Sequence, residues 1–319
     1  MTDVPAADDP AGELPVGVVG VVGLGAMGRP MALALGSAGP VLAWDADPGA
    51  RDRAVGEGVA LATSLEHLAR ECGAVVLSLP SAAVVAQVVA QVVSEVVAQV
   101  AEVAGAGPEL LLLDTSTIGP EDSRSIAATA RAAGATYLDT PVLGRPEMVG
   151  RWTVPMGGPA AAQPEVARVL APVAARVVHV GDVGAGATLK VANNLMFSVI
   201  NAVTAEALVL ATAAGLDPGV FVDTVVDSGA ASVSGLFRSI APRAVAGDFD
   251  PIFALDLVRK DNALAVGLAA SLGVELPVGA AALALHEQAV EAGHGAEDSV
   301  AVVKVLEERL GRPARRTGT

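Results

Sequence analysis

The sequence contains little cysteine, few aromatic residues and few basic ones, and each shortage excludes a class of protein. Its one cysteine, Cys72, cannot form an internal disulfide or a cysteine-rich metal site. Because Cys72 lies in an apolar, helix-like stretch, we expect a buried and unreactive thiol. The four histidines show no spacing typical of metal ligands, so no metal is expected.

The charge balance excludes nucleic acid as a partner. Lysine and arginine number 20 against 35 acidic residues, and the resulting net charge of -15 repels phosphate backbones. Aromatic residues make up only 3% of the chain, and no basic stripe with interleaved aromatic side chains occurs.

One apolar run, residues 82–103, is long enough to cross a bilayer. Its Gln, Ser and Glu residues recur every three or four positions and therefore lie on one stripe of a helix. We expect an amphipathic helix packed on a sheet, and no membrane partner. Residues 1–15 are acidic and rich in Pro and Ala, which predicts a disordered tail, no secretion signal and a cytoplasmic protein.

The order of apolar runs and helical patterns predicts an α/β protein of two domains. In residues 16–182, a Rossmann-type doubly wound sheet is indicated, because near-continuous apolar runs alternate with helices. From residue 183 to 310 only helical periodicity remains, which predicts an all-helical domain. A second disordered tail is expected at 311–319. The expected strands are 16–22, 41–44, 74–79, 110–114, 136–139, 152–156 and 176–180.

A long helix over residues 185–213 is expected to join the two domains. At 1.5 Å per residue it would be roughly 43 Å long. Gly215 can end it in a left-handed cap, and Asp217 with Pro218 suits the start of the next helix.

A glycine-rich fingerprint directly follows the first expected strand and opens a helix over 26–38. This position between a strand and a helix is what makes the motif specific for dinucleotide binding. Its glycines allow a tight turn and the close approach of a pyrophosphate to the N-terminus of the helix. We assign dinucleotide binding to this segment, together with Leu79 and Pro80 at the end of the third expected strand. The fingerprint consists of Gly23, Leu24, Gly25, Ala26, Met27 and Gly28.

Asp45 follows the second expected strand, where a carboxylate can accept hydrogen bonds from both hydroxyls of the NAD ribose. The next residue is Ala46, where an NADP enzyme would offer arginine. NAD is therefore predicted over NADP, with Arg51 and Arg53 as the nearby basic residues that bear on the choice. The alternative is that Asp45 only caps the helix that follows.

Only three lysines accompany 17 arginines, which indicates that each lysine serves a purpose that arginine cannot. An amine can give up a proton near neutral pH in a suitable site, whereas a guanidinium cannot. Lys190 lies near the start of the long helix, and Asn194 is four residues on and on the same face. The two can reach one ligand, unless Lys190 is a surface lysine on a polar stripe.

Several motifs in one order resemble the beta-hydroxyacid dehydrogenases, a family that includes 3-hydroxyisobutyrate dehydrogenase and tartronate semialdehyde reductase. The resemblance spans residues 16–308. It begins with the fingerprint and continues through residues 114–117, which are similar to the D-x-S-T segment beside the nicotinamide, and residues 138–142, the start of the substrate loop. Residues 184–194 match G-x-G-x-x-x-K-x-x-N-N, and Lys260 with Asp261 resembles the closing motif.

The resemblance implies an NAD(P)-dependent enzyme that moves a hydride between nicotinamide and a small 3-hydroxy acid or its semialdehyde. It implies Lys190 as the catalytic acid/base and Asn194 as the neighbour that orients the substrate. Ser116 would bind substrate and Thr117 cofactor, and Lys260 would approach both. A homodimer or homotetramer built through the helical domain is also implied.

The resemblance fails at one place in the substrate loop. Family members have Ser-Gly-Gly where this chain has Leu143, Gly144 and Arg145. Gly144 and Arg145 are therefore candidate substrate residues, with Arg145 either clamping a carboxylate or pairing with Glu147. Two rival functions share the architecture, an imine reductase and a non-catalytic binding module, but imine reductases usually lack a lysine at position 190.

Overall fold

The computed structural model describes residues 17–102, 110–228 and 234–316. The chain forms two compact units, one up to Lys190 and the other from Val191 onward. The tail expected at 1–15 lies outside the described residues.

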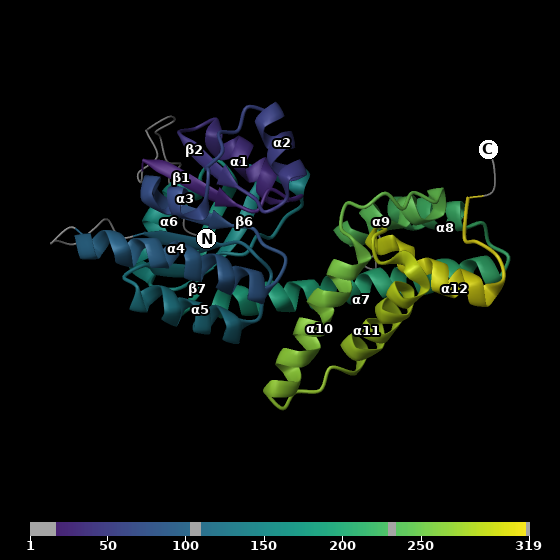
Figure 1. Cartoon of the computed structure of the whole chain (residues 1–319). Helices are drawn as coiled ribbons and strands as arrows, with labels where there is room; N and C mark the ends of the chain where they lie inside the picture. The colour runs from purple at the N-terminus through teal and green to yellow at the C-terminus, as the bar shows by residue number, and fades with distance from the viewer. Residues whose placement is uncertain (1–16, 103–109, 229–233, 317–319) are drawn as a thin grey trace, which may run out of the picture. The chain divides into compact units, whose positions relative to one another are not determined.

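The first unit is built on a seven-stranded sheet, which lies among helices in Figure 1. The strand order is β2-β1-β3-β4-β5-β6-β7. The first five strands are parallel, whereas β6 meets β5 antiparallel at the pair Asp139 and Gly157. All seven runs predicted from the sequence form strands, although the reversed direction of the last two was not foreseen. The strands are β1 (Val18–Val22), β2 (Val41–Trp44), β3 (Cys72–Leu77), β4 (Leu111–Asp114), β5 (Thr136–Asp139), β6 (Trp152–Gly157) and β7 (Ala174–Gly181).

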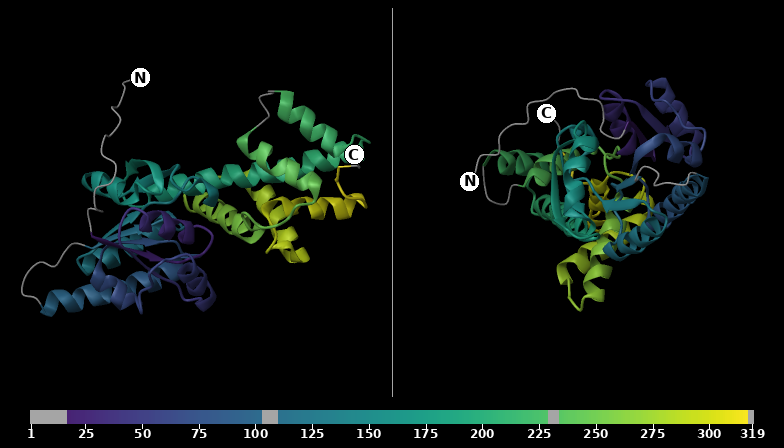
Figure 2. Two further views of the ribbon diagram at one scale, coloured as in Figure 1. Left: turned by 90° about the horizontal axis from the view of Figure 1, so that it is seen from above. Right: turned by 90° about the vertical axis from the view of Figure 1, so that its left-hand side faces the viewer.

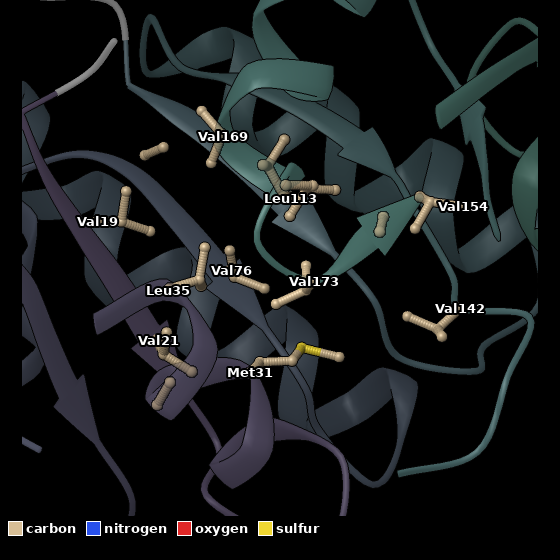
Figure 3. Close-up of a cluster of buried hydrophobic side chains, with 14 of the residues drawn as sticks. Val19, Val21, Met31, Leu35, Val76, Leu113, Val142, Val154, Val169 and Val173 are labelled. Carbon is tan, nitrogen blue, oxygen red and sulfur yellow. The ribbon is translucent and has the colours of Figure 1, made fainter. Parts of the chain in front are cut away.

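Helices cover both faces of the sheet, as a doubly wound sheet requires. Successive residues of a strand point to opposite faces, so Val76 packs in one core cluster and Val75 in the other. Figure 3 shows the first cluster, in which Met31 and Leu35 approach the strand residues. One face carries α1 (Gly28–Gly36), α2 (Pro48–Gly56) and α6 (Gln163–Leu170), and the other carries α3 (Leu65–Glu71), α4 (Ala82–Glu102) and α5 (Pro120–Ala132).

Cys72 does not lie in a helix, so that expectation is wrong. Helix α3 ends at Glu71, and Cys72 begins β3 beside Val18 of β1. The side chain is only 6% exposed, and burial raises the pKa of its thiol to about 12. The predicted burial of the thiol is confirmed, and a raised pKa is typical of an unreactive cysteine.

The described residues of the second unit are helical, apart from turns, loops and one isolated antiparallel bridge between Ala254 and Asp298. Helix α7 has the bounds predicted for the long joining helix, Ala185–Ala213, and is continuous (Figure 2). Gly215 adopts the left-handed conformation at φ +87°, and the Asp217 carboxylate accepts the Val220 N–H at the start of the next helix. The remaining helices are α8 (Pro218–Ser228), α9 (Gly235–Ala246), α10 (Leu255–Ser271), α11 (Pro277–Ala289) and α12 (Val303–Leu310).

Among the described helices, α7 alone is long and apolar enough to cross a membrane, with a mean hydropathy of 1.7 over its richest window. The buried core helix of a globular protein passes the same test. Two of its side chains, Asn194 and Asn201, are buried and donate to Asp261 and Ser299. Paired buried amides are usual where a helix packs against protein, although only 39% of the apolar window of α7 is buried.

The disordered tail expected from residue 311 is wrong for residues 311–316. The Ala314 N–H donates to the Glu307 carboxylate over 2.9 Å, and the Arg316 N–H donates to the Val245 carbonyl over 2.9 Å. Arg315 also pairs with Glu307. Since Glu307 is 8% exposed, its carboxylate needs donors, and the tail supplies them.

His286 of α11 gives a test of this packing. Its side chain is fully buried, and burial lowers its pKa from 6.5 to about 4. A lowered pKa in the folded state means stability that is present above pH 6.5 and lost as the pH falls toward 4, by at most about 3 kcal/mol. In thermal unfolding followed by circular dichroism, the wild-type chain should therefore lose stability over this window relative to His286→Leu. Parallel curves for the two proteins would contradict this burial.

Candidate active site

The fingerprint turn is closed by two glycines that admit no side chain. Gly23 has φ +93°, and a Cβ there would lie 2.2 Å from the Ser78 carbonyl oxygen. A Cβ on Gly28 would lie 1.8 Å from the carbonyl oxygen of Gly23. The turn after β1 is therefore pressed against both the end of β3 and the start of α1, as a tight strand-to-helix turn requires.

Gly25, in contrast, faces open space. A Cβ there would meet no atom within 4 Å, and the residue is exposed. Within the described part of the chain, no protein acceptor is bonded to the N–H groups of Gly25 and Ala26. Donors without acceptors just ahead of a helix form a place for an anion, and the open cradle fits the pyrophosphate of a dinucleotide.

Asp45 is tied to the fingerprint itself. One carboxylate oxygen accepts the Leu24 N–H over 2.6 Å, and the other accepts the Asp47 N–H over 2.8 Å. Two basic side chains lie nearby. Arg51 donates to the carbonyls of Asp45 and Ala46, and Arg53 pairs with Asp47 at 3.6 Å. Asp45 is therefore more than a helix cap, because Asp47 caps α2 and Asp45 orders the fingerprint loop.

The ends of β3 and β4 are joined by Ser116, a predicted substrate residue. Its hydroxyl accepts the Leu79 N–H over 2.9 Å, and its own N–H donates to Asp114 over 2.9 Å. Ser116 is 8% exposed, and its two hydrogen bonds hold together the loops that follow β3 and β4. Its role toward substrate stays a prediction. Thr117, in the same segment, is half-buried, and Pro80, which follows Leu79, is exposed.

Asp114 lies beneath this segment, almost wholly buried at the end of β4. Burial raises the pKa of its carboxyl, and hydrogen bonds from Ser116 and from the Tyr137 hydroxyl, 2.6 Å away, oppose that rise. Burial and the neighbouring Asp114 also raise the pKa of Tyr137. The pair is therefore an inner support, out of contact with solvent, and not a candidate for proton exchange with a ligand.

Lys190 meets the loop that follows β5. Its Nζ donates to the Val142 carbonyl over 2.9 Å. Further along the same loop, a Cβ on Gly144 would lie 2.1 Å from the Trp152 ring, whose Nε1 donates to the Arg145 carbonyl over 2.7 Å. The loop after β5 therefore both binds the Lys190 amine, through Val142, and has its backbone held in place by Trp152, through Gly144 and Arg145.

The Arg145 side chain is less constrained than its backbone. It approaches Glu147 at 3.9 Å, and the two side chains are 37% and 57% exposed. An ion pair this long and this exposed contributes little energy. Arg145 can therefore exchange Glu147 for another anion.

In the second unit, two predicted site residues, Asn194 and Lys260, come together on Asp261, which the sequence indicated only as part of the closing motif and not as a site residue. Asp261 accepts the Asn194 amide over 2.6 Å and pairs with the Lys260 ammonium at 3.0 Å. Asn194 and Asp261 are 5% and 4% exposed. Spacing along the chain gave no signal for this meeting, since 67 residues separate Asn194 from Asp261.

Comparison with known proteins shows the family. Residues 18–181 match the family described as the NAD binding domain of 6-phosphogluconate dehydrogenase, and residues 184–306 match the NAD-binding segment of NADP-dependent 3-hydroxyisobutyrate dehydrogenase. The 2-(hydroxymethyl)glutarate dehydrogenase of Eubacterium barkeri is 32% identical over 92% of this chain and 96% of its own length. The chain belongs to the beta-hydroxyacid dehydrogenases. It is thus an oxidoreductase of the CH–OH group that uses a nicotinamide cofactor.

The solved structures agree with this placement. The 3-hydroxyisobutyrate dehydrogenase of Salmonella typhimurium has a TM-score of 0.79 and is 34% identical, covering 91% of this chain and 99% of its own. An imine reductase from Pseudomonas sp. also matches, with a TM-score of 0.54 at 21% identity, over 91% of this chain and 99% of its own. The second likeness shows a shared fold only.

Two of the three fingerprint glycines of this dehydrogenase, Gly25 and Gly28, predict different outcomes on substitution. Gly25→Ala adds a methyl group that meets no protein atom, so the melting temperature should stay within about 2 °C while NAD affinity falls at least tenfold. Gly28→Ala, the matched control, should lower the melting temperature because its methyl group strikes the Gly23 carbonyl. Differential scanning fluorimetry and isothermal titration calorimetry measure both effects. Normal NAD affinity in Gly25→Ala would contradict the pyrophosphate assignment.

Proposed function

We propose that this chain is an NAD-dependent dehydrogenase that moves a hydride between nicotinamide and a small 3-hydroxy acid or its semialdehyde, with Lys190 as the acid/base. The observation that carries the proposal is the Lys190 contact with Val142, since it ties the only lysine in the sequence of the first unit to the loop that the family uses for substrate. We further propose residues 16–182 as the cofactor domain and 183–310 as the helical domain.

The chemistry divides between cofactor and protein. NAD, when bound at the fingerprint, supplies the hydride acceptor for the hydroxyl-bearing carbon. Lys190 Nζ receives the hydroxyl proton as the carbonyl forms and returns it in the reverse reaction. Asn194, four residues on along α7, orients the substrate through its amide. No histidine is proposed for this transfer, because the described ones have other surroundings: His286, for example, is fully buried.

Substrate recognition is proposed to rest on the loop after β5 and on Ser116. Arg145 would bind a carboxylate in place of the serine donor that the family loop usually supplies. The weak, exposed pairing with Glu147 supports this, because an incoming carboxylate can replace Glu147 at little cost. The 2-(hydroxymethyl)glutarate dehydrogenase among the relatives acts, by its name, on such an acidic compound.

NAD is proposed over NADP because of the contacts around Asp45. Its carboxylate lies at the end of β2 beside the fingerprint and would repel a 2′-phosphate. Of the two basic side chains that could attract such a phosphate, Arg51 is held by two backbone carbonyls. Arg53 makes only a 3.6 Å pair with Asp47, between side chains that are 59% and 61% exposed, and is the nearby charge that weighs against the choice of NAD. Lys260 is proposed as a further cofactor contact, as the family resemblance implies.

We also propose a cytoplasmic homo-oligomer that assembles through the helical unit. Of the 13 exposed large apolar side chains among the described residues, ten lie in that unit and only three, Leu33, Val55 and Met148, in the other. Met196, Val203 and Leu210 recur every seven residues on α7 and are 64%, 53% and 71% exposed, which supports burial against a second copy. The buried free thiol of Cys72 is compatible with a reducing compartment.

Substitution of Lys190 tests the acid/base role. Lys190→Ala should lose roughly 10²- to 10⁴-fold in kcat while NAD affinity is kept, because proton transfer is lost and the fingerprint is untouched. Lys190→Arg should fail to restore turnover, since a guanidinium restores the charge without a transferable proton. Steady-state kinetics with the best 3-hydroxy acid and calorimetric NAD titration measure the two quantities. Near-normal turnover in Lys190→Arg would remove the acid/base assignment.

A paired substitution tests the cofactor choice. Asp45→Ala with Ala46→Arg should shift the ratio of kcat/KM for NAD to that for NADP toward NADP by at least tenfold, because it removes the charge that repels the 2′-phosphate and adds one that binds it. Ala46→Arg alone is the control and should shift the ratio less. Faster turnover of the unmodified chain with NADP than with NAD would overturn the proposal.

A further inference from the structure

Asp139 joins two segments that are far apart in the sequence and that both carry the proposed chemistry. It is the last residue of β5 and is 2% exposed. One carboxylate oxygen accepts the Gly184 N–H over 2.8 Å, and the other accepts the Ala187 N–H over 2.7 Å. The partners lie 45 and 48 residues further along the chain, at the beginning of α7.

The contact satisfies the first turn of α7 from outside the helix. The first N–H groups of a helix have no partner within it, and a carboxylate there also meets the positive end of the helix dipole. Burial raises the pKa of Asp139, whereas the N–H groups of Gly184, Ala187 and Gly186 pull it down. These donors make the buried carboxylate tolerable, and the carboxylate in turn fixes where α7 begins.

The space around this carboxylate is closed. A Cβ on Gly157 of β6 would lie 2.4 Å from one carboxylate oxygen, and a Cβ on Gly186 would lie 2.7 Å from the Asp139 carbonyl oxygen and 2.8 Å from that of Pro155. Strand and helix can therefore approach this closely only because both positions are glycine. The beginning of α7 has no room to shift against the end of β5.

Lys190 follows Ala187 by less than one helical turn, and its Nζ is bonded to Val142, three residues after Asp139. Asp139 thus fixes both partners of the lysine contact: the beginning of α7, which carries Lys190, and the end of β5, which leads to Val142. We propose that Asp139 is a positioning residue for the reaction, which sets the register of α7 against the loop after β5 and so holds the Lys190 amine in place. This inference rests on the proposed acid/base role of Lys190.

Asp139→Asn tests it, because an amide can accept only one of the two N–H groups and turns its own NH2 toward the other. We expect kcat to fall roughly 10- to 100-fold, the effect of a small misplacement of a catalytic group, with NAD affinity within about twofold of normal. Ala187→Pro is the second variant, since it deletes one donor at a first-turn position where proline is tolerated, and it should lower kcat in the same direction. Glu307→Gln, a buried carboxylate of α12, is the control and should lower the melting temperature without changing kcat.

A double-mutant cycle shows whether Asp139 acts through Lys190. In the Lys190→Ala background, measured at high enzyme concentration, Asp139→Asn should cause no further loss of kcat. An equal loss in both backgrounds, or an unchanged kcat in Asp139→Asn and Ala187→Pro, would overturn the positioning role. No loss from Lys190→Ala itself would instead overturn the proposed function, so the two failures are distinguishable.

Discussion

Buried backbone N–H groups at the carboxyl edge of the parallel sheet need acceptors, and this chain supplies several of them with aspartates that end or follow its strands. Asp45 accepts from Leu24, Asp114 from Ser116, and Asp139 from the beginning of α7. The three loops so anchored carry the fingerprint, the Ser116–Thr117 segment and the lysine contact. Although only 17% of the residues are charged, three carboxylates, of which Asp114 and Asp139 are buried, fix the backbone of the loops of the proposed site.

Local pattern predicted the elements well because each signal lies within a few residues. Apolar runs located all seven strands, and Gly215 with Asp217 marked the end of one helix and the start of another. The reversed direction of β6 and β7 could not be read, because an apolar strand covered on both faces looks the same in either direction. Cys72 was misjudged for a similar reason, since a short apolar run after a helix can continue it or begin a strand.

The candidate site was predictable where a motif is local and not where it depends on tertiary contact. The fingerprint, Asp45 and Lys190 stand out by spacing and by composition, and the family resemblance added Ser116, Thr117 and Lys260. The hydrogen bonds of Asp139 and Asp261 reach across 45 residues or more, so no periodicity reveals them. The contact between the C-terminal residues and Glu307 was missed likewise, because chain ends usually fray and the sequence does not reveal that the carboxylate on α12 is buried.

The central claim is that a family scaffold with an altered substrate loop oxidises small 3-hydroxy acids with NAD. The most direct measurement is the absorbance of reduced nicotinamide when the purified protein is mixed with a panel of 3-hydroxy acids and NAD or NADP, and separately with cyclic imines and NADPH. The account predicts NAD-dependent reduction of the cofactor by at least one 3-hydroxy acid and no turnover of the imines. Imine reduction without oxidation of any hydroxy acid would contradict it.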